Sequence, residues 1–161
     1  MKGSHRIIVE SRKVKYDFTV KRNITILTGD SGSGKTVLME LIRDYRRYGA
    51  DSGVQVSCDC ECRTIENEDW ERTIQEASPC IFFIDEGNRF LYTKNFARAV
   101  QQSEHYFVIA TREKLPMLPY SMNEIYGFRK SGNFMRRNRH ITKFIAFTEI
   151  LQKVKKLHRN L

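Results

Sequence analysis

A glycine-rich segment at residues 29–36 has the residue types and spacing in this sequence that most clearly point to chemistry. It matches the pattern G-x-x-x-x-G-K-[ST] at every position. Glycines allow a turn to aim several backbone N–H groups at one anion, and Lys35 adds an ammonium group that reaches the β- and γ-phosphates of a nucleotide. The Thr36 hydroxyl is a ligand for Mg²⁺. The residues expected to contact nucleotide are Gly29, Asp30, Ser31, Gly32, Ser33, Gly34, Lys35, Thr36 and Val37.

The segments on either side have the patterns that such a loop needs. Residues 23–28 (NITILT) are β-branched and apolar, which predicts a strand that runs into the loop. From Thr36 to Tyr48 apolar residues recur at helical spacing, and Gly49 is a natural helix end. The N-terminus of that helix would direct its free N–H groups at the phosphates. We therefore expect the chain to bind ATP or GTP with Mg²⁺, and the absence of an N-K-x-D guanine-reading motif favours ATP.

Two further apolar segments end in polar residues that suit the same site. Residues 80–84 (CIFFI) predict a strand buried on both faces, and it delivers Asp85 and Glu86 at its end. Asp85 can hold Mg²⁺ through water, and Glu86 is placed to polarise an attacking water. Residues 106–110 predict a second buried strand, after which Thr111 could orient the water and Arg112 could stabilise developing charge. The alternative for Arg112 is a simple ion pair with Glu113 or another surface acid.

Strands and helices alternate along the chain, and this predicts an α/β fold. Residues 6–10 and 14–20 form an N-terminal β-hairpin, and the central apolar strands indicate a mainly parallel sheet covered by helices on both faces. Residues 123–128 and 140–147 read as edge strands and 148–159 as a basic terminal helix. We expect one domain, with a hairpin at 1–22, a nucleotide-binding core at 23–128 and a basic C-terminal extension at 129–161.

These motifs resemble the additional-strand, catalytic-glutamate division of P-loop NTPases, which includes the AAA+, ABC-type and STAND ATPases. The resemblance rests on residues 29–36, on 81–86 (IFFIDE) and on the strand 106–112, and it spans residues 6–128. It implies a P-loop NTPase three-layer α/β/α sandwich with Glu86 as catalytic base and Thr111 as sensor. The L-S-G-G-Q signature of ABC-type proteins and the helical lid of AAA+ proteins are missing from this sequence.

Three functions are compatible with these residues. Hydrolysis of ATP coupled to conformational change or assembly is the leading one, because two adjacent acids accompany the loop. A small-molecule or nucleotide kinase would use the same loop, and residues 112–139 contain arginines that an acceptor-binding lid would need. A nucleotide-binding switch without significant hydrolysis is the third.

The positive charge of the chain is concentrated at its C-terminal end. The net charge is +9, yet residues 129–161 hold ten Lys and Arg against Glu149 alone. This segment could attract nucleic acid or an acidic protein partner, although a solubilising surface is equally compatible. Aromatic residues among the basic ones are expected to serve packing rather than base stacking. A homo-oligomer, with Arg89, Arg98 or Arg112 acting on a neighbouring subunit, is also open.

The cysteines and the overall hydropathy give weaker indications. Cys58, Cys60 and Cys62 alternate with acids, which would place them on one face of a strand as reduced thiols, and the spacing is not that of a zinc knuckle. Neither a run of roughly 20 apolar residues nor a secretory signal is present, so a cytoplasmic location is expected.

Overall fold

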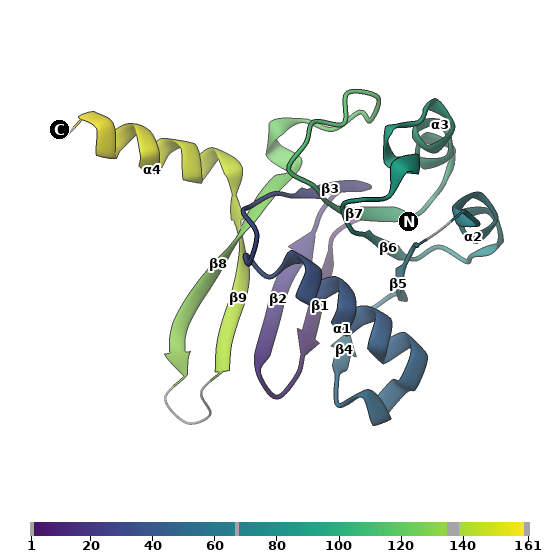
Figure 1. Ribbon diagram of the computed structural model, residues 1–161, viewed down its shortest axis with the longest axis horizontal. Coiled ribbons are helices and arrows are strands. Elements are labelled where there is room, and N and C mark those ends of the chain that lie inside the picture. Colours follow the sequence, from purple (N-terminus) through teal and green to yellow (C-terminus); the bar gives the residue numbers. More distant parts are fainter. Residues whose placement is uncertain (1, 67, 135–138, 160–161) are drawn as a thin grey trace.

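The computed structural model describes residues 2–66, 68–134 and 139–159, and nine strands of this part form one sheet (Figure 1). The strands are β1 (His5–Glu10), β2 (Val14–Val20), β3 (Ile24–Leu27), β4 (Gln55–Ser57), β5 (Cys62–Thr64), β6 (Ile81–Ile84), β7 (Tyr106–Ala110), β8 (Ile125–Phe134) and β9 (Arg139–Ala146). The helices are α1 (Lys35–Tyr48), α2 (Trp70–Glu76), α3 (Lys94–Gln102) and α4 (Phe147–Arg159), with short 3-10 turns η1 (Gly49–Ser52), η2 (Arg89–Tyr92) and η3 (Met122–Glu124).

The sheet is mixed. Its strand order is β4-β1-β2-β9-β8-β3-β7-β6-β5. Antiparallel pairings join β1 to β2, β1 to β4 and β8 to β9, whereas parallel pairings join β2 to β9 and connect β8, β3, β7, β6 and β5 in that order. The expected hairpin of β1 and β2 is present, but it belongs to the same sheet as the rest.

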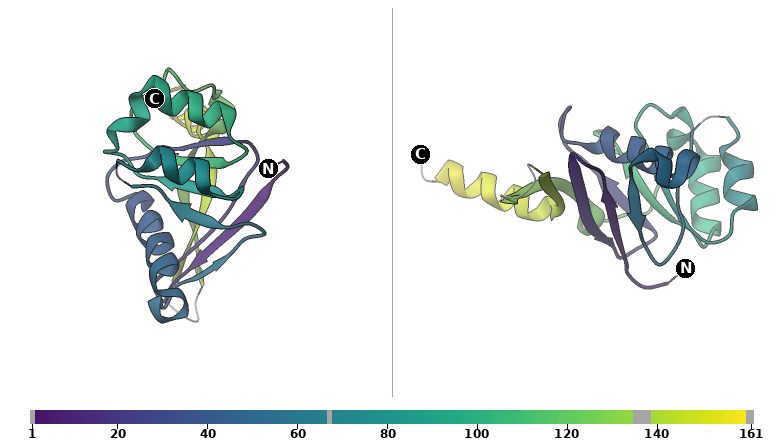
Figure 2. Two further views of the ribbon diagram at one scale, coloured as in Figure 1. Left: turned by 90° about the vertical axis from the view of Figure 1, so that its right-hand side faces the viewer. Right: turned by 90° about the horizontal axis from the view of Figure 1, so that it is seen from below.

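The predicted mainly parallel three-layer α/β/α sandwich is wrong. Strand β9 pairs with β2 on one side and β8 on the other, so the hairpin and its antiparallel pairings are built into the sheet. The sheet curls toward a barrel, because its two edge strands, β4 and β5, are separated in the chain only by residues 58–61 and both pack against α1 (Figure 2). A curled, mixed sheet of this kind is not the fold of the additional-strand, catalytic-glutamate P-loop NTPases, so that assignment is also wrong.

The two segments predicted as edge strands are interior ones. Residues 123–128 and 140–147 correspond approximately to β8 and β9, and both have neighbours on each side in the sheet. The reason is their antiparallel pairing with each other, which sequence alternation does not reveal.

Two apolar cores lie against opposite faces of the β6 and β7 strands. Alternate residues of β6 point to opposite faces, so Phe82 packs in the core that holds Trp70 and Phe96, whereas Phe83 packs with Leu38 of α1. All four residues of β6 are fully buried, as the continuous apolar run predicted. These cores fix the parallel strands β3, β7 and β6 whose ends carry the predicted site residues.

Candidate functional site

The 29–36 loop connects β3 to α1 through backbone that only glycine adopts easily. Gly29, Gly32 and Gly34 have φ values of 147°, 80° and 99°. Gly34 is the N-cap of α1 in a left-handed conformation, and among the described residues no side chain caps this helix. The first turn of α1 also contains no acidic residue. The backbone N–H groups of this turn are therefore available to an anion.

Lys35 is the buried cation of this loop. Only 5% of the residue is exposed. Its Nζ donates to Gly29 O at 2.5 Å, to Asp30 O at 3.4 Å and to Ser33 Oγ at 3.2 Å. The ammonium group thus lies within the turn, where incoming phosphate oxygens would exchange with these three acceptors.

Tyr16 of β2 holds the loop from behind. Its hydroxyl donates to Gly34 O at 2.8 Å. Burial raises the pKa of Tyr16 to about 12, so the phenol keeps the proton that this bond needs at neutral pH. A Cβ atom on Gly34 would lie 2.9 Å from the Tyr16 hydroxyl, too close for any residue but glycine. The N-terminal hairpin therefore fixes the position of the α1 N-cap.

The remaining predicted contact residues of the loop face solvent. Asp30, Ser31, Gly32, Thr36 and Val37 are exposed, and Ser33 is partly buried. Ser33 N donates to Asp30 O at 3.1 Å and closes the turn. Thr36 and Val37 lie in the first turn of α1. The loop thus surrounds Lys35 with polar groups that solvent can reach.

The tips of β3, β7 and β6 lie at one edge of the sheet. Parallel register pairs Leu27 with Ala110 and Ile84 with Ile109, so Thr28, Asp85 and Thr111 follow at nearly the same level. Neighbouring strands are about 4.8 Å apart, which places the β6 tip roughly 10 Å from the β3 tip. The sheet therefore brings Asp85, Glu86, Thr111 and Arg112 to the edge from which the 29–36 loop begins.

Asp85 and Glu86 occupy a tight turn after β6. Glu86 N donates to Asp85 Oδ1 at 2.9 Å, and the Asn88 side chain donates to Asp85 O at 2.8 Å. Gly87 allows this turn with a φ of 99°. Glu86 Oε2 lies 3.6 Å from Arg112 Nε, so the alternative for Arg112, an ion pair with an acid, is what this structure contains, and its partner is the predicted base.

Thr111 is buried, and its hydroxyl closes a turn with Glu113. The hydroxyl accepts from Glu113 N at 3.0 Å and donates to Glu113 O at 3.3 Å. Tyr92, at the end of η2, lies beside this turn: burial first, then hydrogen bonding and charge from Glu113 and a smaller effect of Glu86, raise its pKa. Thr111 is therefore at the predicted strand tip, with its polar contacts directed to its own turn.

Sequence reasoning missed Tyr16, Asn88 and Tyr92. The alternation of β2 indicated a strand, but no local pattern shows that the Tyr16 hydroxyl reaches a loop 18 residues further on. Asn88 and Tyr92 lie in the turn and 3-10 segment after β6, for which the sequence has no periodic signal. All three act through side-chain contacts that depend on the folded sheet.

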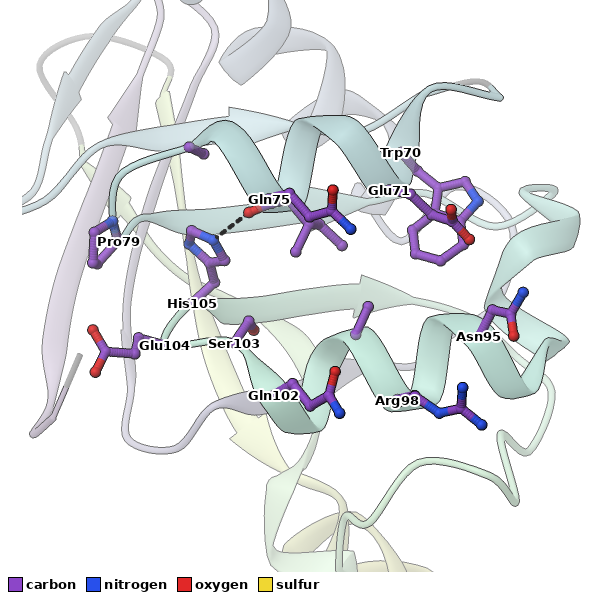
Figure 3. Close-up of a pocket in the computed structure, with 13 residues that line it drawn as sticks. Trp70, Glu71, Gln75, Pro79, Asn95, Arg98, Gln102, Ser103, Glu104 and His105 are labelled. Atoms are coloured by element: carbon purple, nitrogen blue, oxygen red, sulfur yellow. Dashed lines mark hydrogen bonds between the residues drawn. The ribbon is translucent and has the colours of Figure 1, made fainter.

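A separate cavity of about 620 Å³ lies between α2 and α3 (Figure 3). Trp70, Arg98, Glu104 and His105 are among its lining residues. His105 Nε2 lies 2.9 Å from Ile74 O, and this contact is the dashed line in Figure 3. None of the predicted site residues lines this cavity, so it does not belong to the 29–36 site.

Comparison with known proteins gives no relative. No protein-family model matches the chain, and no curated protein matches its sequence. The resemblance to P-loop NTPases thus has no support from a family match, in addition to the disagreement in fold. None of the described helices is long and apolar enough to pass through a membrane.

Proposed function

We propose that the chain binds a nucleoside triphosphate, with ATP as the leading candidate, together with Mg²⁺ at the 29–36 loop. The observation that carries this proposal is the nearly buried Lys35 ammonium at the N-terminus of a helix without a side-chain cap. A buried cation beside free helical N–H groups suits an anion with several oxygens. Thr36, one residue further, supplies a hydroxyl for the metal.

We further propose that the bound nucleotide is hydrolysed. Asp85 would hold Mg²⁺ through water, and Glu86 would accept the proton of the water that attacks the γ-phosphate. Arg112 contacts Glu86 and is itself exposed on 55% of its side chain, so it can reorient toward a developing negative charge. Thr111 would support this edge of the site from its buried turn.

Binding is tested by titrating the protein with a fluorescent ATP analogue, with and without Mg²⁺. We expect Lys35→Ala to weaken binding by about 100-fold or more, because it removes the only charged group of the loop that faces the phosphates. Lys21→Ala is the matched control, since Lys21 is exposed in the link between β2 and β3, at the opposite end of β3. Equal affinity of Lys35→Ala and wild type would reject the site.

Hydrolysis is tested by phosphate release. Glu86→Gln keeps the size of the side chain but removes the base, so the rate should fall by about 10²–10⁴ while nucleotide affinity changes little. Transfer of the labelled γ-phosphate to a nucleotide or sugar, without release into water, would instead identify a kinase. Tight binding with no phosphate release and no transfer would leave a nucleotide-dependent switch.

The context of this activity is also proposed. The basic segment 129–161 is offered as a contact for nucleic acid or for an acidic protein partner, and residues 135–138 and 160–161 of it lie outside the described part of the chain. A homo-oligomer and a cytoplasmic location complete the proposal. Phosphate release measured with DNA or RNA, and at two protein concentrations, tests the first two of these.

A further inference from the structure

A cluster of thiol, imidazole and carboxylate groups lies where the two edges of the sheet come together. Residues 58–61 link β4 to β5 and pass the beginning of β1. In the antiparallel pairing of β1 with β4, Ile8 is opposite Ser57 and Val9 opposite Val56. The same register continued by three residues would bring Cys60 opposite His5. The fold thus joins residues that are 55 positions apart in the chain.

The polar atoms of this cluster are within one coordination sphere of each other. His5 Nδ1 lies 3.8 Å from Cys60 Sγ and 2.8 Å from Asp59 Oδ1. Cys58 Sγ lies 3.5 Å from both Cys60 Sγ and Asp59 Oδ1. A tetrahedral ion with bonds of about 2.0 Å to nitrogen and 2.3 Å to sulfur has its ligand atoms roughly 3.3–3.8 Å apart. The two sulfur-containing distances from Cys60 match this requirement.

The imidazole is held in place by packing. His5 is only 8% exposed, and its ring meets that of Tyr106 edge-on at 5.1 Å. Its Nε2 is buried and has no hydrogen-bond partner among the described residues. The polar contacts of this ring are therefore on the Nδ1 side, toward Asp59 and Cys60. A ligand whose orientation is fixed before binding loses little freedom when a metal arrives.

The four cysteines of the chain are free thiols, and the expected arrangement of three of them was partly wrong. Cys58 and Cys60 lie between strands and only Cys62 lies in one, and all three are half-buried rather than on a buried strand face. Two half-buried thiols, an imidazole and a carboxylate form a donor set that suits Zn²⁺, whereas Mg²⁺ prefers oxygen ligands alone.

We propose that His5, Cys58, Asp59 and Cys60 bind one Zn²⁺ ion that fastens β1 to the link between the two edge strands of the sheet. Cys62 begins β5, which pairs with the start of β6, so the cluster lies at the opposite edge of the parallel strands from Asp85 and Glu86. This position assigns the ion a structural role and separates it from the proposed nucleotide site. Metal bound only by the folded chain stabilises it.

The proposal is tested on the full chain after chelator treatment under reducing conditions. Titration with Zn²⁺ should show one equivalent bound and should raise the thermal unfolding midpoint, and Co²⁺ should give thiolate-to-cobalt charge-transfer absorption. Cys60→Ser and His5→Asn should each weaken binding by about 100-fold or more, because each removes a direct ligand. Cys80→Ala is the matched control, since Cys80 also lies near an imidazole, with its Sγ 3.7 Å from His105 Nδ1.

A second measurement needs no variant and so does not depend on whether the substituted proteins fold. Alkylation of the wild-type protein, followed by mass spectrometry, should show that Zn²⁺ slows modification of Cys58 and Cys60 at least 10-fold but leaves Cys80 unchanged. Failure of wild type to bind Zn²⁺ at micromolar concentration, a cobalt spectrum without thiolate absorption, or alkylation rates unaffected by Zn²⁺ would overturn the proposal.

Discussion

Arg112 Nε lies 3.6 Å from Glu86 Oε2 and thereby connects the tip of β7 to the tip of β6. The two side chains are 55% and 38% exposed, so the pair stabilises the fold little. Its geometric effect is larger, because it fixes the carboxylate that we propose as the base. Opening of this pair would release both the base and a guanidinium at the same edge of the sheet.

Replacement of Arg112 by Ala should separate these two effects. We expect phosphate release to fall by about 10²–10³, as for the loss of a transition-state donor, while unfolding free energy changes by less than about 0.5 kcal/mol. Phosphate-release kinetics and denaturant unfolding measure both quantities. Arg98→Ala is the control, since Arg98 is exposed on α3 and should leave the rate unchanged. A wild-type rate in Arg112→Ala would remove this residue from the mechanism.

The contact of Tyr16 with Gly34 can be tested by a double-mutant cycle. Tyr16→Phe should cost about 1 kcal/mol of unfolding free energy through the lost hydrogen bond. Gly34→Ala should cost about 1–3 kcal/mol, because alanine is strained at a φ of 99° and its Cβ meets the tyrosine hydroxyl at 2.9 Å. The double variant should be less destabilised than the sum of the two, since removing the hydroxyl also removes the collision.

Gly53→Ala is the control for this cycle. Gly53 has a φ of 70° but no atom within 4 Å of the position its Cβ would take, so it reports the backbone cost alone. Denaturant unfolding of the five proteins gives the coupling. Strict additivity of Tyr16→Phe and Gly34→Ala would show that the collision does not contribute.

His105 joins three elements behind the cavity of α2 and α3. Cys80 N donates to its Nδ1 at 3.2 Å, so Nε2 carries the proton that is donated to Ile74 O at 2.9 Å. We expect His105→Ala to lower the unfolding free energy by about 2–4 kcal/mol, since it leaves two buried groups unpaired and opens a void. Gln102→Ala, at an exposed cavity residue, should change it by less than about 0.5 kcal/mol. Comparable unfolding curves for both variants would contradict this role.

The sequence predicted the elements around the site better than their arrangement. Continuous apolar residues at 81–84 and 106–110 identified buried strands, and the glycine pattern identified the strand, loop and helix of residues 24–48, because these signals are local. The place of β9 between β2 and β8 depends on pairings with residues more than 100 positions away, and alternation alone does not encode a partner. The same limit hid the contact of His5 with Cys60, which requires the register of β1 with β4.

Acid should weaken the hairpin through Asp17. Arg6 donates to both oxygens of Asp17, at 2.9 Å and 2.8 Å, and this hydrogen bonding lowers the pKa of Asp17 below its ordinary value of 3.8. A lowered pKa in the folded state means that the stabilisation is complete above the unfolded pKa and is lost as pH falls through the folded one. The stability difference between wild type and Asp17→Asn should therefore be constant near neutral pH and vanish in strong acid.

Unfolding curves at a series of pH values measure that difference. Arg6→Gln should abolish the same pH-dependent part, because the carboxylate then lacks its partner. A difference between wild type and Asp17→Asn that persists unchanged below the lowered pKa would show that the ion pair is not its cause.

Helix α4 extends away from the rest of the molecule and carries part of the basic segment (Figures 1 and 2). Its beginning is fixed by Ile150, which lies against Gly127 of β8, whereas Leu157 is 68% exposed. Removal of residues 153–161 should therefore leave the fold intact and take away Lys153, Lys155 and Lys156. If this segment binds nucleic acid, fluorescence anisotropy should show weaker binding and a shallower dependence on salt, by about 0.7 in logarithmic slope for each lost phosphate contact on a single strand. Identical affinity and slope for the truncated and full chains would exclude this part of α4 from the contact.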